Sequence, residues 1–333
     1  PGGFQGEDTD VLAKAVLTRA NPPVCADVTA ALERDQDRET GDYNRFWAER
    51  DYVRDAGKVR ASVFLVHGLH DFNVRTLQAG QWWKALGENR VPRKLWLHQA
   101  GHTDPFNVRR DIWLATLHRW FDQWLYRIDT GIMREPVADV EVAPHRWQTS
   151  RTWPLPSAGL RFGGPRQTFA DNPARTAEDL AAGETAADPN RVVHLTGPLT
   201  RDTRLSGTPT VTVRADLTGQ SPYLTALLVD YGPAVRYAGL RTLAEEDCIG
   251  PGIAGDPGCF RRREYVTAET PYEIVTRGWL DVRNRLSRVR TVPVAAGQPY
   301  TLRWDLQSTD HVFAAGHRIG VVLISTDRDY TLR

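Results

Sequence analysis

The chain has 333 residues, of which 41% are hydrophobic and 25% charged, so it is neither fully disordered nor fibrous and has room for about two ordinary domains. Its 42 basic and 41 acidic side chains leave a formal net charge of +1, which excludes a long-range field that would draw it to nucleic acid or an anionic membrane. No apolar run approaches the ~20 residues that a membrane-spanning helix needs, so we expect no membrane partner.

Residues 1–147 are expected to form an α/β region. The apolar run ASVFLVH (61–67) predicts a buried parallel strand, and TLQAGQWWKALGE (76–88) has the apolar spacing of a helix. RKLWLHQ (93–99) predicts a second buried strand, and DIWLATLHRWFDQWLYRI (111–128) a second amphipathic helix. This alternation of strand and helix is typical of a doubly wound α/β sheet.

The remainder of the chain has a different composition and period. Residues 148–190 are rich in Pro, Gly and Ala and predict a connector over a surface. In residues 191–333 the hydrophobic period changes to two, without a helical pattern between the apolar runs, which favours an antiparallel β-sandwich. The strands are expected at 208–217, 223–232, 235–243, 299–306 and 317–326.

Two of the three cysteines enclose a short segment rich in Gly and Pro. Cys248 and Cys259 are the ends of CIGPGIAGDPGC, and we predict that a disulfide joins them. A zinc site would need two close pairs of ligands, and the chain has only one further cysteine, Cys25. A disulfide favours a secreted or extracellular protein, with the cytoplasm as the alternative.

Two loops carry the residues that point to chemistry. GLHDFNV follows the first predicted strand and contains Asp71, and AGHTDPF follows the second and contains His102. Parallel strands joined by a helix bring such loops to the same edge of the sheet, about 5 Å apart if the strands are neighbours. Asp71 and His102 would then be within hydrogen-bonding reach, and a carboxylate that holds an imidazole is two-thirds of a nucleophilic triad.

Two other interpretations of these residues stay open. His67, His70 and His102 are potential metal ligands, but Gly101 and the predicted strand argue against a zinc-binding helix at HQAGH, so we expect no metal and no cofactor. In the second interpretation, Asp71 caps the following helix and His102 is an ordinary loop histidine.

The chain contains no evident nucleophile. In an α/β-hydrolase the G-x-S-x-G elbow precedes the acid and the histidine, yet only Ser62 precedes Asp71, and it lies in a predicted strand. Either the serine lies upstream of Pro1 or the protein is not a hydrolase.

Four segments carry a resemblance to a known family: YNRFWAERDYV, VRASVFLVHGLHDFNV, LWLHQAGH and RWFDQWLYRIDTGI. Together they resemble the Xaa-Pro dipeptidyl-peptidase group of serine hydrolases, whose relatives include cocaine esterase and the α-amino-acid ester hydrolases. The resemblance implies the C-terminal part of an α/β-hydrolase domain with cap helices at about 21–57, followed by a jelly-roll β-sandwich. It makes Asp71 the triad acid and His102 the triad histidine, and it places the serine in a missing N-terminal segment.

The expected function is therefore that of a serine peptidase that releases Xaa-Pro dipeptides from proline-containing peptide substrates, with this chain inactive alone. Asn73, just after the acid, is a candidate for substrate binding. The alternatives are an esterase or acylase of the same fold, and a non-catalytic β-sandwich that binds a ligand or holds a homodimer.

Overall fold

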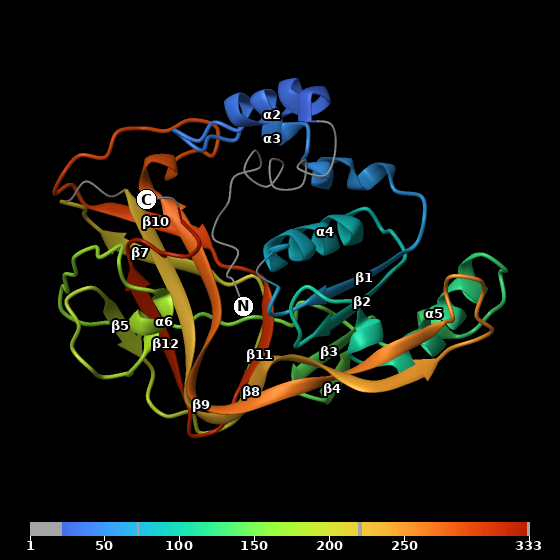
Figure 1. Cartoon of the computed structure of the whole chain (residues 1–333). Helices are drawn as coiled ribbons and strands as arrows, with labels where there is room; N and C mark the ends of the chain where they lie inside the picture. The colour runs from blue at the N-terminus through green and yellow to red at the C-terminus, as the bar shows by residue number, and fades with distance from the viewer. Residues whose placement is uncertain (1–21, 72, 219–221, 332–333) are drawn as a thin grey trace.

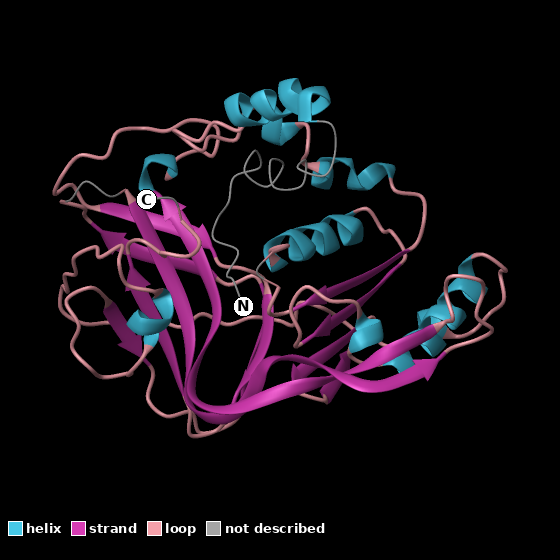
Figure 2. Ribbon diagram, viewed as in Figure 1, coloured by secondary structure: helices cyan, strands magenta, loops and turns pink. Residues whose placement is uncertain are grey.

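The computed structural model describes residues 22–71, 73–218 and 222–331. Outside this part lie residues 1–21 of the expected α/β region and the last two residues of the expected sandwich. Phe72, in the loop GLHDFNV that contains Asp71 (residues 68–74, the acid loop), also lies outside it. Figure 1 shows an α/β portion and a β-rich portion that are connected along one side by a long pair of strands. Figure 2 shows that most of the described helices lie in the first portion.

The first portion contains a sheet with the strand order β1-β2-β3-β4. β1 (Val63–Gly68) pairs in parallel with β2 (Arg93–His98), and β2 pairs in parallel with β3 (Ala138–Ala143). The antiparallel β4 (Arg146–Ser150) completes the sheet, and α4 (Thr76–Glu88) connects β1 to β2. The two predicted strands and this helix are thus confirmed, whereas β3 and β4 were not predicted, and the expected domain boundary at 147 falls within β4.

Helices surround this sheet. Before the sheet in the chain come α2 (Pro22–Asp35), α3 (Arg45–Ala48) and the 3₁₀ helix η1 (Tyr52–Lys58). Figure 1 shows α2 and α3 on the side of α4 that faces away from the sheet. Two further 3₁₀ turns, η2 (Pro105–Asn107) and η3 (Ile132–Arg134), flank α5 (Arg110–Trp124), which is shorter than the predicted helix at 111–128. None of the helices within the described residues is both long and apolar enough to cross a membrane.

The second portion is antiparallel throughout its described pairings. Its strands form a sheet of order β5-β12-β8-β9 and two pairs, β10-β7 and β11-β6, with the short α6 packed beside them. The buried core lies between these strands and includes Leu224, Leu302 and Phe313. The bounds are α6 (Ala177–Ala181), β5 (Val192–Leu195), β6 (Thr203–Gly207), β7 (Thr210–Ala215), β8 (Tyr223–Cys248), β9 (Cys259–Asp281), η4 (Val282–Asn284), β10 (Tyr300–Asp305), β11 (Thr309–Phe313) and β12 (Arg318–Ile324).

The strands of the second portion differ in part from the prediction, which did not include β5, β6, β9 and β11. Instead of separate strands at 223–232 and 235–243, β8 is continuous, and the Gly232-Pro233 pair is absorbed in a register shift between Tyr231 and Ala234. Proline is tolerated there because a bulge frees its backbone nitrogen from the ladder. β12 pairs only with the Thr225–Tyr231 stretch of β8, so the outer parts of β8 and β9 pair with each other alone.

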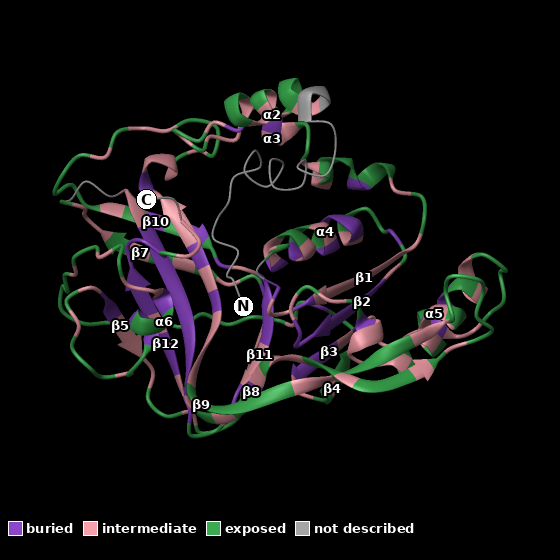
Figure 3. Ribbon diagram, in the orientation of Figure 1, coloured by how far each residue is buried: buried purple, intermediate pink, exposed green. Residues whose placement is uncertain are grey.

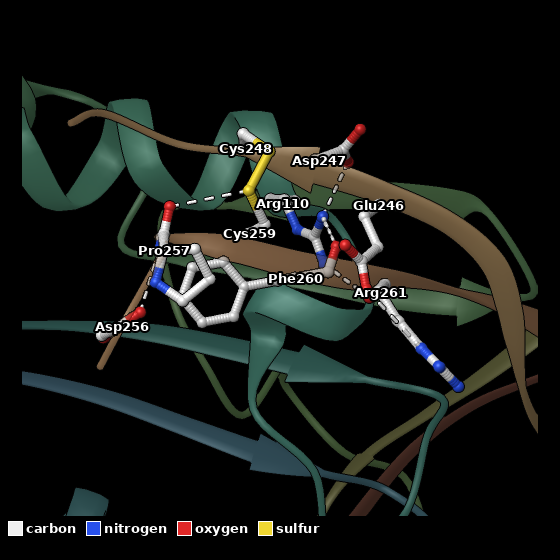
Figure 4. Close-up of a disulfide and its surroundings, with 10 residues drawn as sticks. Arg110, Glu246, Asp247, Cys248, Asp256, Pro257, Cys259, Phe260 and Arg261 are labelled. Atoms are coloured by element: carbon white, nitrogen blue, oxygen red, sulfur yellow. Dashed lines mark hydrogen bonds and ion pairs between the residues drawn. A yellow bond between two sulfur atoms is a disulfide. The ribbon is translucent and has the colours of Figure 1, made fainter. Parts of the chain in front are cut away.

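We call these outer parts, residues 234–248 and 259–270, the ribbon. Figure 1 shows the ribbon passing below β3 and β4 towards α5, and Figure 3 shows that much of it is exposed. At its tip a disulfide joins Cys248 to Cys259, which face each other across the two strands. Arg110 of α5 donates to Asp247 Oδ2 at 2.6 Å, so the tip is attached to the α/β portion (Figure 4).

Candidate active site

The candidate site lies at the carboxyl ends of β1 and β2. The two strands stay paired up to Gly68 and His98, and backbone hydrogen bonds then continue into the loops, from Leu69 N to His98 O (2.7 Å) and from His70 N to Ala100 O (3.3 Å). The acid loop and the loop AGHTDPF that contains His102 (residues 100–106, the histidine loop) therefore leave the sheet side by side.

This close approach requires a glycine. A Cβ on Gly68 would lie 2.3 Å from the carbonyl oxygens of both Ala100 and Gly101, well inside contact distance. Any larger residue would displace the histidine loop from the end of β1.

Asp71 and His102 form the hydrogen bond that the strand order predicts, with 2.8 Å between His102 Nδ1 and Asp71 Oδ2. The other carboxylate oxygen of Asp71 accepts from the backbone N–H groups of Asn73 and Val74, both at 2.9 Å. Asp71 therefore caps its own turn and orients the imidazole at the same time. The expectation that Asp71 caps the following helix is wrong, because α4 has Arg75 at its N-cap and no side-chain hydrogen bond there.

The burial of the pair suits a proton transfer at the outer ring nitrogen. The Asp71 side chain is 4% exposed, whereas the His102 side chain is 61% exposed. Because Nδ1 donates to the carboxylate, the neutral ring keeps a lone pair on Nε2, where it can accept a proton. Within the described residues no serine side chain hydrogen-bonds to His102.

The neighbouring histidines do not converge on a metal. His67 Nε2 lies 2.9 Å from Val74 O, and burial lowers the pKa of its ring. His98 is fully buried, and burial lowers its pKa to about 4, so it is neutral at physiological pH. In the part of the chain that the structure describes, no group of three or more His, Cys, Asp or Glu is arranged to hold a metal ion.

Asn73 is exposed, and its described contact with the site is made by its main chain. Its backbone N–H stabilises the acid, while substrate binding by its side chain stays a prediction.

Sequence reasoning missed a buried carboxylate under the histidine loop. Glu141 of β3 is 0% exposed and accepts hydrogen bonds from Gln99 N (2.8 Å), His145 N (2.7 Å) and the hydroxyl of Tyr265 in the ribbon (2.6 Å). Gln99 also donates through its side chain to Glu141 O at 2.7 Å. The available signal was an acidic residue within the alternating run ADVEVA, but nothing local identifies its partners.

A second missed contact involves His70, next to the acid. Its ring bridges Gln99 O, at 2.5 Å from Nδ1, and the Glu273 carboxylate, at 3.0 Å from Nε2. Both missed contacts thus connect the region of the two loops to β9 of the second portion.

Comparison with known proteins places this site in a family context. Residues 130–333 match the family model described as the X-Pro dipeptidyl-peptidase C-terminal non-catalytic domain, and residues 1–104 match that of X-Pro dipeptidyl-peptidase (S15 family). A putative Xaa-Pro dipeptidyl-peptidase of Bacillus anthracis is 42% identical over all of this chain and 52% of its own length. One from Streptomyces avermitilis is 44% identical over 90% of this chain and 48% of its own length. The chain thus spans about half the length of these curated relatives.

Solved structures show the same fold at low sequence identity. An α-amino acid ester hydrolase covers 98% of this chain with a TM-score of 0.59 and 16% identity, and the chain covers 58% of that protein. A CocE/NonD family hydrolase from Staphylococcus aureus covers 97% with a TM-score of 0.57 and 13% identity, and 57% of it is covered.

Proposed function

Because the chain belongs to the Xaa-Pro dipeptidyl-peptidase family, we propose that it carries the acid and the base of a serine peptidase that releases Xaa-Pro dipeptides from peptide N-termini. The observation that carries this proposal is the 2.8 Å hydrogen bond between buried Asp71 and exposed His102 at the end of two parallel strands. We further propose that the nucleophilic serine belongs to a part of a longer protein outside these 333 residues, since the chain spans about half of its relatives and has no G-x-S-x-G elbow. The chain alone is then inactive.

In this mechanism His102 Nε2 takes the serine proton as the serine oxygen attacks the carbonyl carbon of the proline at the second position of the substrate. The imidazolium then gives that proton to the leaving amine as the peptide bond breaks. Water then attacks the acyl-enzyme ester while His102 Nε2 takes its proton. His102 returns that proton to the serine oxygen as the ester bond breaks, which releases the dipeptide and restores the serine. Asp71 fixes the ring orientation and stabilises the imidazolium without taking its proton.

The other features implied by the resemblance are also proposals. We propose that residues 22–58 form the cap and that β5–β12 form the jelly roll. The disulfide at the ribbon tip supports an oxidising, extracytoplasmic location.

The test is release of p-nitroaniline from Ala-Pro-p-nitroanilide by the full-length protein that contains this chain. We expect His102→Ala to lower kcat about 10⁶-fold and Asp71→Asn about 10⁴-fold. His118→Ala, at an exposed position on α5, is the matched control and should leave the rate unchanged. Absence of dipeptide release by the wild type would refute the proposal, and a higher kcat/KM for a p-nitrophenyl ester would favour the esterase alternative.

A further inference from the structure

The ring of His70 contacts two groups that can only accept hydrogen bonds. Nδ1 lies 2.5 Å from the main-chain oxygen of Gln99, and Nε2 lies 3.0 Å from Glu273 Oε1. A neutral imidazole has a single N–H, so both bonds to a carbonyl and an ionised carboxylate require the imidazolium. The geometry therefore defines a charged ring at this position.

The carboxylate of Glu273 is itself held from a second direction. Its Oε2 lies 2.9 Å from Arg236 Nε, and Arg236 also contacts Asp230 Oδ2 at 3.2 Å. Asp230 in turn accepts from His311 and His317, at 2.9 Å each, in the interior of the second portion. Glu273 is thus the end of a charged network that begins in the β-rich core.

The groups around His70 stabilise its charged form. Burial lowers the pKa of His70, but the hydrogen bond and charge of Glu273, assisted by Gln99 O and by the charge of Glu141, raise it above its ordinary value. Burial would raise the pKa of Glu273, yet the hydrogen bond and charge of His70 lower it to about 2. The other neighbours are the Tyr237 ring of β8, 5.3 Å from the His70 ring, and the neutral His98 of β2.

The position of His70 gives this contact its significance. His70 directly precedes Asp71, and Gln99 belongs to the loop that leads to His102. We propose that His70 is a positioning residue whose charged ring ties the acid loop to the histidine loop, and that Glu273 of the second portion holds it in that state. The consequence for catalysis rests on the proposed function, but the contact itself does not.

Deprotonation of His70 removes one of its two donors. Either the bond to Gln99 or the bond to Glu273 is then lost, and the alignment of His102 on Asp71 loosens. Both hydrogen bonds of the His70 ring, and with them the alignment of His102 on Asp71, are therefore present below the folded-state pKa of His70. They are lost as the pH rises through this pKa. This produces an alkaline limb in kcat/KM that belongs to His70.

The experiment is a pH titration of the full-length protein labelled with ¹³C at histidine Cε1, with signals assigned by His70→Gln and His102→Gln. We expect the pKa of His70 to lie above the ordinary value of about 6.5 in the wild type. In Glu273→Gln this pKa should fall by about 1–3 units. The chemical shift of His102 should change as His70 titrates, with an inflection at the pKa of His70 that moves with this pKa in Glu273→Gln. Glu269→Gln, at an exposed site on the same strand, is the matched control and should change neither titration.

Kinetics gives an independent measurement. The alkaline limb of kcat/KM should move to lower pH in Glu273→Gln and disappear in His70→Gln, which keeps an amide donor but has no titrating ring. An ordinary pKa for His70 in the wild type, or an equal change in Glu269→Gln, would overturn the inference. Because the ring titration needs no turnover, an inactive protein with the expected titration would reject the peptidase proposal and retain this one.

Discussion

The hydroxyl of Tyr265 offers a direct test of how the ribbon stabilises the histidine loop. Among the described residues it is one of three donors to the Glu141 carboxylate, which is 0% exposed, and the O–O distance is 2.6 Å. Burial and the neighbouring Glu141 charge raise the pKa of Tyr265, so its phenol remains a donor across the physiological range. Tyr265→Phe leaves a buried charge with one donor fewer, which should cost about 1.5–3 kcal/mol of unfolding free energy.

Tyr272→Phe is the matched control, because this hydroxyl of the same strand donates to a neutral carbonyl, Glu178 O, at 2.8 Å. Its loss should cost less than about 1.5 kcal/mol, the upper value for a bond between neutral groups. Urea denaturation of the full-length protein at pH 7 measures both variants, and an unchanged m-value shows that the comparison concerns stability alone. A Tyr265→Phe destabilisation no larger than that of Tyr272→Phe would refute the view that this contact anchors the loop.

Three further changes address the loops and the ribbon. Gly68→Ala should displace the histidine loop and destabilise the protein, measured as a fall in Tm, whereas Gly163→Ala, whose Cβ meets nothing within 4 Å, should not. The acid sensitivity of the fold should come partly from Glu273, whose folded pKa of about 2 lies below its unfolded value. This stabilisation, about 2–3 kcal/mol, is present above an unfolded pKa of about 4.3 and is lost as the pH falls towards 2. In Glu273→Gln the urea midpoint should therefore change less between pH 5 and pH 3 than it does in the wild type. Opening the disulfide with a Cys248→Ser, Cys259→Ser double variant should cost at most about 3 kcal/mol and increase amide exchange in the ribbon first.

Local pattern was sufficient for the elements that carry the acid and the histidine. The helix at 76–88 has the predicted bounds because its apolar residues follow a period that only a helix satisfies, and β1 and β2 lie within two residues of the predicted strands. The proximity of Asp71 and His102 followed from the geometry of neighbouring parallel strands, without any knowledge of side-chain packing.

The groups beneath these loops could not be found in this way. Tyr265 and Glu141 are 124 residues apart in the chain, and His70 and Glu273 are 203 apart, so their pairing depends on where β9 lies. β9 also contains charged residues and Pro271, and much of its ribbon part is exposed on both faces. It therefore lacks the apolar alternation by which β7, β8, β10 and β12 were predicted.

The chemistry of these contacts indicates what the second portion contributes to the site. Packing two portions together requires only apolar surface. Charges such as the buried Glu141 and the half-buried Glu273 are costly unless every partner is in place. Such contacts are weak sources of stability, but they tolerate only one relative position, because a small shift leaves a charge without its donor. Tyr265 is connected to the histidine loop through Glu141, which accepts from Gln99 N, and Glu273 bonds directly to His70 of the acid loop. These two residues of β9 thus support both loops from outside the α/β sheet. We therefore expect β9, which lies in the region that matches the family model described as non-catalytic, to help keep Asp71 and His102 aligned, although no described side chain of β5–β12 hydrogen-bonds to either residue.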